Sequence, residues 1–360
     1  MNRLPADILI DILCRLPIKS LMRCRCVCKS LLNLTRDSRF TQAHLSRSSL
    51  TNPPLLLNQL HFVDSDMYFA EHEQTNGYTC TKLNLFASNF NETQFRVVGS
   101  CNGLLCLVHH QFCHMICVCN PFTRECIKLP YRIDSSQRGR EVEAVIGFGF
   151  SAKMSEYKVV EMIHCSSGVS PWSDVFVYGL GDKSWRGIGG VPYAVMRRLG
   201  SIAFVNGALH WVCYSPAGLI VSLDIADEVF DVIPQPEFGL LRQGCYSLGE
   251  LNGCLSITDS SFYDRVEIWM MQCYKTKESW NKCFAINFNQ VQWNIRFAQT
   301  VCLQRDGKLL LLYNKEALLL YDPQTVNLRM LSISGIPYCF EAFNHVASLV
   351  SPWGCLRSDR

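Results

Sequence analysis

The segment RLPIKSLMRCRCVCKSL, residues 15–31, carries three cysteines at alternate positions among arginines and lysines. On a strand, Cys24, Cys26 and Cys28 would share one face, where they could bind a single zinc ion. Across 21–31, however, apolar residues recur at steps of three and four, which is typical of an amphipathic helix. On a helix, Cys24 and Cys26 point about 200° apart. We therefore expect cysteines that pack and share no metal.

The flanking residues predict two more short helices. Before the segment, Ile8, Ile12 and Leu16 form an apolar stripe at intervals of four. Pro17 cannot continue that helix, so the chain should turn there and begin the next one. Asp37 is a good N-cap for the third. Three short helices bury little apolar area alone, so we expect this module to complete its core against a partner.

Charge divides the chain into two parts. Residues 1–47 contain nine Lys and Arg against three Asp and Glu, a balance of +6, whereas the remainder has 25 against 28, a balance of −3. A basic N-terminal part on a slightly acidic body favours an acidic partner. Nucleic acid is a weaker alternative because the basic residues have no interleaved aromatic side chains. A solvated basic face is a third interpretation.

The stretch LPADILIDILCRLPIKSLMRCRCVCKSLLNLTRDSRFTQAHL, residues 4–45, resembles the plant F-box motif over nearly its whole length. The match follows the order of the motif, from Leu-Pro through Arg-Leu-Pro and Lys-Ser-Leu to the final His-Leu. The resemblance implies binding to the adaptor Skp1, an acidic protein, and through it to a cullin–RING ubiquitin ligase.

By motif position, eight residues would form or support the Skp1 interface: Leu4, Pro5, Ile8, Leu16, Pro17, Leu21, Val27 and Cys28. One position departs from the family pattern, since Leu31 stands where the family usually has tryptophan. The change removes aromatic area but keeps an apolar side chain.

After residue 54 the helical periodicity ends and short alternating runs begin. Four runs open with Asn-Gly or Asp-Gly followed by apolar residues, at Asn102, Asn206, Asn252 and Asp306. Such dipeptides supply the positive-φ residues of a tight hairpin turn.

A second repeating piece is strand, polar turn and strand. Its copies are spaced 59, 45, 50 and 48 residues apart when they are aligned on Cys126, Trp185, Phe230, Trp280 and Leu328. Periods of about 40 to 50 residues with several strands per unit indicate propeller blades. Residues 55–95 could supply a sixth, weaker unit, and we expect a closing strand from 345–350.

Residues 97–350 resemble the F-box-associated interaction domain of plant proteins, a relative of kelch propellers, through pieces such as SCNGLLCL, NPFTRECIKLP and NGALHWV. The predicted fold class is α+β multidomain, with a three-helix F-box followed by an all-β propeller-like domain of about six blades. The expected boundaries are 1–47 for the F-box, 48–54 for a linker, 55–350 for the propeller and 351–360 for a tail.

The stretch HHQFCHMICVC, residues 109–119, offers nitrogen and sulfur ligands at close spacing: His109, His110, Cys113, His114, Cys117 and Cys119. This composition raises a zinc hypothesis. On strands, however, successive residues face opposite sides, and no separate CxxC pair completes a set of four ligands. We expect a polar hairpin loop and a thiol-rich strand without structural metal.

No pattern for catalysis is present. The chain lacks a Gly-x-Ser-x-Gly elbow, a cysteine-protease signature and the phosphate-binding glycine motifs. Asp224, Asp227 and Glu228 lie at expected blade turns, where acidic residues serve turn geometry. Five tryptophans could line a ligand face but are expected to pack between blades: Trp185, Trp211, Trp269, Trp280 and Trp293. We therefore predict no catalytic residues and no cofactor.

The N-terminal residues do not have the pattern of a signal peptide, because Asp7 and Asp11 interrupt their apolar stretch. No apolar run approaches the ~18 residues of a membrane span. The 20 cysteines are then expected to be reduced thiols. These features predict a protein of the cytoplasm, the nucleus or both.

Together these patterns predict the substrate-recognition subunit of an Skp1–cullin–F-box ligase, which binds an unidentified protein and neither nucleic acid nor membrane. A non-degradative F-box scaffold, and a propeller enzyme or metal protein using the 109–119 cluster, remain alternatives. Two turn-rich insertions are expected to bind the substrate: 131–141 with Arg138 and Arg140, and 164–174 with Trp172. Both could instead be solvated spacers.

Overall fold

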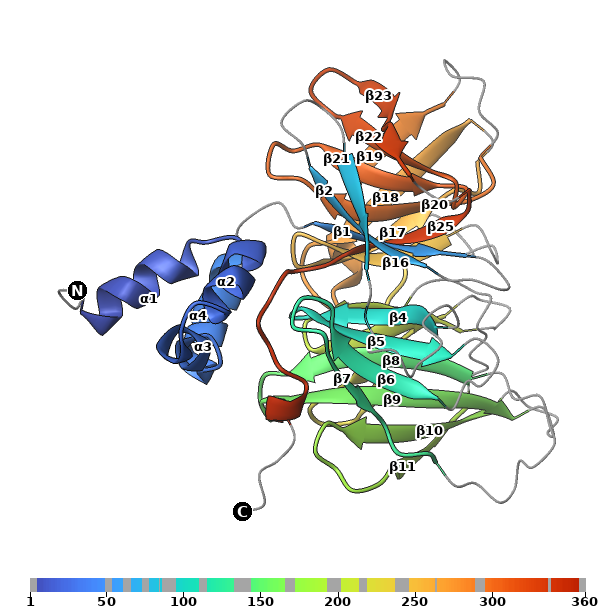
Figure 1. The fold of residues 1–360 in the computed structure, drawn as a ribbon. Helices are drawn as coiled ribbons and strands as arrows, with labels where there is room; N and C mark the ends of the chain where they lie inside the picture. Colours follow the sequence, from blue (N-terminus) through green and yellow to red (C-terminus); the bar gives the residue numbers. More distant parts are fainter. Residues whose placement is uncertain are drawn as a thin grey trace. The chain divides into compact units, whose positions relative to one another are not determined.

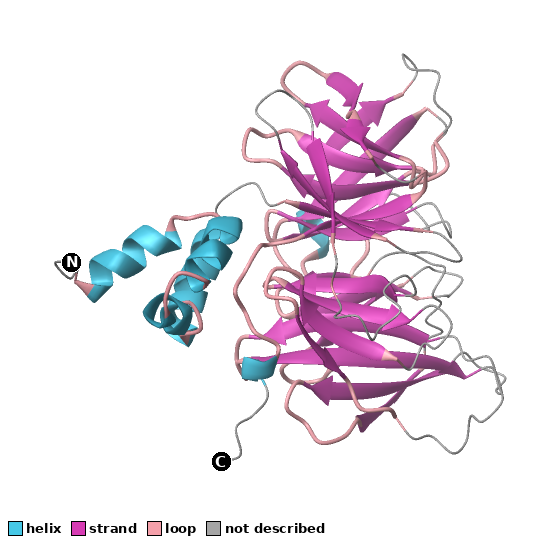
Figure 2. Ribbon diagram, in the orientation of Figure 1, coloured by secondary structure: helices cyan, strands magenta, loops and turns pink. Residues whose placement is uncertain are grey.

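A computed structural model describes residues 5–48, 54–60, 66–72, 78–83, 85, 95–109, 115–132, 144–165, 172–192, 202–213, 219–236, 246–262, 264–288, 295–335 and 338–355. The chain forms two compact units, one of residues 1–129 with 343–360 and one of residues 130–342. Helices occupy the N-terminal part, and the regular secondary structure of the rest is almost entirely strand, connected by loops (Figure 2).

The N-terminal part contains four helices where three are predicted: α1 (Ala6–Cys14), α2 (Ile18–Arg25), α3 (Lys29–Leu34) and α4 (Ser38–Ser48). The single helix expected across 21–31 is interrupted. The backbone N–H groups of Cys26 and Val27 bond three residues back, and Cys28 is extended, with φ −157°. The steps of three and four therefore continue across a tight turn, which periodicity alone does not distinguish from a helix.

The helix boundaries follow local rules. α1 ends at Cys14 and α2 begins directly after Pro17, as expected for a residue that cannot continue a helix. The Asp37 carboxylate accepts the backbone N–H groups of Arg39 and Phe40, at 2.9 and 3.1 Å, which confirms it as the N-cap of α4.

The rest of the chain is a six-bladed β-propeller (Figure 1). The first unit of the molecule contributes β1 (Leu55–Gln59), β2 (Met67–His72) and β3 (Tyr78–Lys82), with β25 (Phe340–Asn344) beside β1, and the blade β4–β7 (Phe95–Cys101, Leu104–His109, Ile116–Asn120, Glu125–Lys128). The pairings β1–β2, β2–β3, β4–β5, β5–β6 and β6–β7 are antiparallel. The predicted sixth, weaker unit is the sheet of β1–β3.

The second unit contains four four-stranded antiparallel blades. They are β8–β11 (Ala144–Ser151, Glu156–Cys165, Trp172–Gly179, Arg186–Val191), β12–β15 (Ala203–Val205, Ala208–Val212, Ile220–Asp224, Phe230–Ile233), β16–β19 (Tyr246–Leu251, Cys254–Asp259, Arg265–Met271, Trp280–Asn287) and β20–β23 (Ala298–Leu303, Leu309–Tyr313, Ala317–Asp322, Asn327–Met330). The short β24 (Ile333–Ser334) and the 3₁₀ turns η3 (Lys277–Ser279) and η4 (Trp353–Cys355) complete the described elements.

The prediction of a closing strand at residues 345–350 is wrong. The last strand is β25, and residues 345–350 after it belong to no strand. Instead of strand pairing, side chains satisfy carbonyl groups of this segment: Asn120 donates to the carbonyls of Ser348 and Val350. A buried carbonyl must be bonded, but the bonding partner need not be another strand.

The dipeptides that mark the blade starts adopt the predicted turns. Asn102 and Gly103 have φ of 50° and 82°, and the pairs at 206–207 and 252–253 are equivalent. In the fourth, Asp306-Gly307, the glycine has φ 82° and the Asp306 carboxylate accepts the N–H of Lys308. Each turn joins the first and second strands of its blade.

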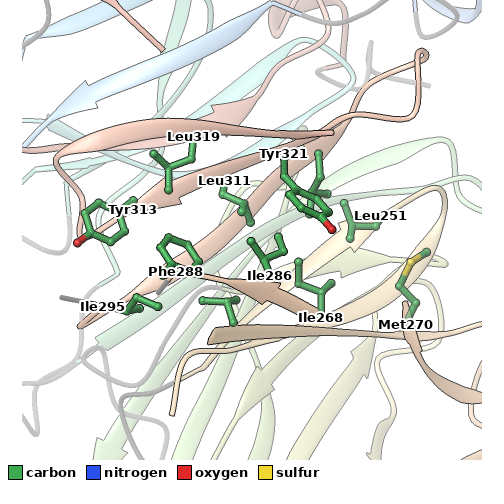
Figure 3. Close-up of a cluster of buried hydrophobic side chains, with 13 residues drawn as sticks. Leu251, Ile268, Met270, Ile286, Phe288, Ile295, Leu311, Tyr313, Leu319 and Tyr321 are labelled. Atoms are coloured by element: carbon green, nitrogen blue, oxygen red, sulfur yellow. The ribbon is translucent and has the colours of Figure 1, made fainter. Parts of the chain in front are cut away.

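Apolar faces of neighbouring blades form the cores of the second unit. Figure 3 shows the cluster between β16–β19 and β20–β23, in which Ile268, Ile286, Leu311 and Leu319 are buried. Burying an aliphatic side chain contributes about 1.5–3 kcal/mol, so a cluster of this size holds adjacent blades together.

Candidate functional site

Three large apolar side chains are exposed on the N-terminal helices. Ile8 and Ile12 lie one turn apart on α1, and Val27, in the turn between α2 and α3, is 73% exposed. The adjacent side of α1 is apolar too, since Leu9 and Leu13 pack into the helical core. A helix with two apolar sides can bury only one of them within its own module, so the other is available to a partner.

The structure distributes the eight predicted interface residues among three environments. Pro5, Ile8, Pro17, Val27 and Cys28 are exposed. Leu16 is half-buried against the helical core, and Leu21 is completely buried in it. Leu4 lies outside the described residues. Leu21 can therefore support the surface by holding α2 in place, but it cannot touch a partner in this conformation.

Sequence reasoning left two exposed residues out of the interface. Ile12 belongs to the stripe Ile8–Ile12–Leu16, which was interpreted as one face although the structure exposes Ile8 and Ile12 and half-buries Leu16. Cys26 is exposed beside Val27. The signal for Ile12 was available: α1 carries more apolar residues than one buried face requires.

Exposed basic side chains lie on the same part of the chain as these apolar residues. Arg15, Arg23 and Lys29 are exposed on the same three helices. Two carboxylates lie on α1 (Asp7 and Asp11). Asp11 bonds to Arg47 at 2.9 Å and to Arg15 at 2.6 Å, and these contacts lower its pKa. The F-box segment as a whole keeps its excess of basic residues.

The three cysteines of the opening segment do not behave alike. Cys24 packs against the helical core, whereas Cys26 and Cys28 are exposed, so the packing interpretation is wrong for those two. The break between α2 and α3 turns them outward. Within the described parts of the chain, no group of three or more His, Cys, Asp or Glu side chains is arranged to hold a metal ion.

The described residues of the 109–119 stretch belong to a blade core. His109 ends β5, and Cys117 and Cys119 are buried on one side of β6, while 110–114 lie outside the described residues. A hydrogen bond with Cys126, together with burial, raises the pKa of Cys117 far above its usual range. A metal ligand is a thiolate, and this environment opposes its formation.

The predicted substrate-binding residues are only partly described. Arg138 and Arg140 lie outside the described residues. Trp172 opens β10 and is 43% exposed; its indole N–H donates to Asp174 at 3.0 Å. A Cβ on Gly190 of the neighbouring strand would lie 2.3 Å from the indole nitrogen, so the ring rests directly on that glycine.

The acidic residues of the β14–β15 turn have different roles (Asp224, Asp227 and Glu228). The Asp224 carboxylate does cap its turn by accepting the N–H groups of Ala226 and Asp227. Glu228, by contrast, accepts hydrogen bonds from Lys158 and Arg186 of the blade β8–β11. Arg186 and Lys158 lower the pKa of Glu228 to about 2. The turn residue therefore links two blades electrostatically.

Of the five tryptophans predicted to pack between blades, those that the structure describes mainly pack against strands and blade cores. Trp211 and Trp280 are buried, and Trp269 packs at the edge of the same core as Trp280. Trp185 and Trp280 donate to the carbonyls of Pro130 and Pro234, both at 2.8 Å. Trp293 lies outside the described residues.

Comparison with known protein families gives a match for each of the two parts of the chain. Residues 1–43 match the F-box domain, and residues 57–351 match the F-box associated beta propeller domain. The Aleuria aurantia lectin in complex with a fucose-containing sugar has a structure that covers 79% of this chain and 97% of its own. Its identity is 9% and its TM-score 0.45, too low to support an argument.

Relatives are found in Arabidopsis thaliana. F-box protein At3g07870 is 34% identical over 97% of this chain and 92% of its own length. F-box protein CPR1 is 28% identical over 97% and 89%, and F-box/kelch-repeat protein At3g23880 is 27% identical over 98% and 96%. The chain is therefore a member of the plant F-box proteins that carry a C-terminal F-box-associated β-propeller domain.

Proposed function

We propose that this protein is the substrate-recognition subunit of an Skp1–cullin–F-box ubiquitin ligase. The observation that carries the proposal is the exposure of Ile8, Ile12 and Val27 on an F-box whose helices already pack their other apolar residues into a core. An exposed apolar surface of this kind on a folded module marks a binding site. The exposed basic side chains of the F-box suit an acidic Skp1-type adaptor.

The propeller would hold a protein substrate for ubiquitination and proteasomal degradation. F-box proteins are in general non-catalytic adaptors, and binding alone suffices for this role. Two binding surfaces on one chain raise the local concentration of substrate lysines near the ubiquitin-carrying enzyme. No cofactor is needed for this role. We propose the cytoplasm, the nucleus or both as its location; none of the described helices is long and apolar enough to cross a membrane.

The adaptor contact can be tested with a matched pair of valines. Val27 on the F-box and Val326 in a propeller turn are both 73% exposed. Val27→Glu should reduce Skp1 capture by the full chain at least 100-fold, because it places a carboxylate in an apolar interface facing an acidic partner. Val326→Glu should bind Skp1 as the wild type does. Equal binding by both variants, measured by titration calorimetry, would contradict the assigned surface.

A non-degradative scaffold shares the adaptor contact and differs in its outcome. Some proteins should be captured by the wild type in cells but not by variants substituted at Arg138, Arg140 and Trp172. These proteins should accumulate when Val27→Glu replaces the wild type. Unchanged lifetimes of those captured proteins would favour the scaffold. The enzyme alternative gains no support from the described residues of the 109–119 stretch, which lie in a blade core.

A further inference from the structure

Residues 345–350, which we name the C-terminal strap, are bonded to the blade β4–β7. Asn120 Nδ2 donates to the Ser348 and Val350 carbonyls at 2.9 and 2.7 Å. Ser348 Oγ donates to the Asn102 carbonyl at 2.9 Å. Both blade residues lie at turns at the same end of the blade, one between β4 and β5 and one between β6 and β7.

The other side of the strap is apolar and packs on the F-box. Leu349 is buried in one cluster with five helical residues: Leu13, Cys14, Ile18, Leu21 and Phe40. Ala347 of the strap and Phe122 of the β6–β7 turn pack against the same cluster. Figure 1 shows the C-terminal segment running between the helices and β4–β7. A second link joins the two modules, because Lys19 of α2 forms an ion pair with Glu71 of β2.

The strap approaches the blade closely at a glycine. A Cβ on Gly103 would lie 2.0 Å from Ser348 Oγ and 2.8 Å from the Val346 carbonyl oxygen. No such contact exists at Gly207 and Gly253, which occupy the same turn in other blades and have nothing within 4 Å. The glycine of this one blade therefore provides space as well as a positive φ.

The side-chain amide nitrogen of Asn120 bonds to the strap, whereas the turn uses only the side-chain oxygen. Its side-chain oxygen accepts the N–H groups of Phe122 and Thr123 and so closes the β6–β7 turn. In the equivalent turns of two other blades, Asp224 and Asp322 close the turn with a carboxylate oxygen in the same way. An ionised carboxylate has no donor. The amide is thus needed for the strap carbonyls and not for the turn.

We propose that Asn120 and Leu349 are positioning residues of the ligase: through the strap they hold the F-box in one orientation on the blade β4–β7. This inference rests on the proposed function. Along the chain, α4 ends at Ser48 and β1 begins at Leu55. The strap adds a second attachment, formed by the hydrogen bonds of Asn120 and the apolar contact of Leu349, so the adaptor and the β4–β7 blade keep a constant relative geometry during ubiquitin transfer.

The test uses the full chain bound to Skp1 and two isosteric substitutions at equivalent turns. Asn120→Asp keeps the turn oxygen, removes both N–H bonds to the strap and places a carboxylate against two carbonyls. Asp224→Asn makes the reverse change in a blade without a strap. Small-angle X-ray scattering should show a longer maximum dimension and a broader distance distribution for Asn120→Asp alone. Leu349→Ser, which removes only the apolar contact, should reproduce that broadening.

A second readout separates positioning from a merely structural role. In a reconstituted ligase, the lysines of the receptor itself that become ubiquitinated are identified by mass spectrometry. A fixed F-box should restrict modification to a few lysines, and Asn120→Asp should at least double their number while Skp1 affinity stays unchanged. Wild-type scattering and an unaltered lysine pattern in both strap variants would overturn the proposal. If the wild type fails to bind Skp1, the proposed function falls, and scattering of the chain alone still decides whether the strap orders the F-box.

Discussion

Two histidines of the propeller are buried as neutral rings. His210 shares a 2.7 Å hydrogen bond between its Nε2 and the Tyr274 hydroxyl, and His345 Nδ1 lies 2.9 Å from Ser100 Oγ. Burial lowers the pKa of His210 to about 4 and that of His345 to about 3. Both rings contribute to the core only while they carry no charge.

The protein should therefore lose stability in mild acid. Between pH 6.5 and about 4 the unfolded chain protonates these rings while the folded chain does not, so the unfolded state binds more protons. Stability is complete above pH 6.5 and falls with pH, by about 2 kcal/mol for each ring at pH 5. Thermal unfolding at pH 7 and pH 5 measures this loss.

Two substitutions provide the control for that pH dependence. His345→Asn keeps an acceptor for Ser100, and His210→Gln keeps a polar partner for Tyr274. Each should lower the unfolding temperature at pH 7 but reduce the further drop between pH 7 and pH 5. If either variant retains the full wild-type pH dependence, its histidine is not a source of the effect.

At the scale of secondary-structure elements, two equivalent hairpin turns allow the same substitution to be compared with and without a contact to the strap. Gly103 and Gly207 have φ of 82° and 76° in equivalent Asn-Gly turns. Gly207→Ala should destabilise the protein by about 1–2 kcal/mol, the cost of a left-handed residue with a Cβ. Gly103→Ala should cost about 1–3 kcal/mol more, because its Cβ would overlap Ser348. Urea unfolding measures both values.

Comparing the two losses of stability separates the cost of the turn conformation from the cost of contact with the strap. If Gly207→Ala is as destabilising as Gly103→Ala, the cost comes from the turn conformation alone and the strap does not press on the turn. Skp1 binding by Gly103→Ala should persist, since the substitution lies in the blade β4–β7, whereas the exposed residues Ile8, Ile12 and Val27 lie on the F-box.

For the whole molecule, we expect separate surfaces for adaptor and substrate. Trp172 opens β10, at the strand end away from the β8–β9 turn of its blade, and Arg138 and Arg140 belong to the part of the chain between β7 and β8. Replacing Trp172 with Ala and both arginines with Glu should lower substrate capture at least tenfold through loss of hot-spot side chains. Skp1 affinity and thermal stability should change little.

An exposed tryptophan elsewhere provides the control. Trp353 in η4 is 55% exposed, and Trp353→Ala should leave substrate capture unchanged. Quantitative mass spectrometry of proteins captured from plant cells under proteasome inhibition gives the measurement. An identical set of captured proteins from wild type and the triple variant would place recognition on another part of the propeller.

The sequence by itself predicted a helical N-terminal module, a propeller of about six blades and the Asn-Gly turns between paired strands. These features depend on neighbours in the chain: Pro17 and Asp37 set helix boundaries, and Asn-Gly pairs such as Asn102-Gly103 adopt the φ values that hairpins require. The repeat spacing then gave the blade architecture, because each blade is built from consecutive residues.

Only the tertiary structure decided which apolar residues are free and how the F-box is held. Leu21 and Ile12 have similar side chains, yet Leu21 is buried and Ile12 exposed, because Leu349 and Phe40 cover one and not the other. The amide of Asn120 meets a carbonyl 228 residues away in the chain. Periodicity reports the alternation of one segment, whereas burial and hydrogen bonding depend on segments that are distant in sequence and adjacent only after folding.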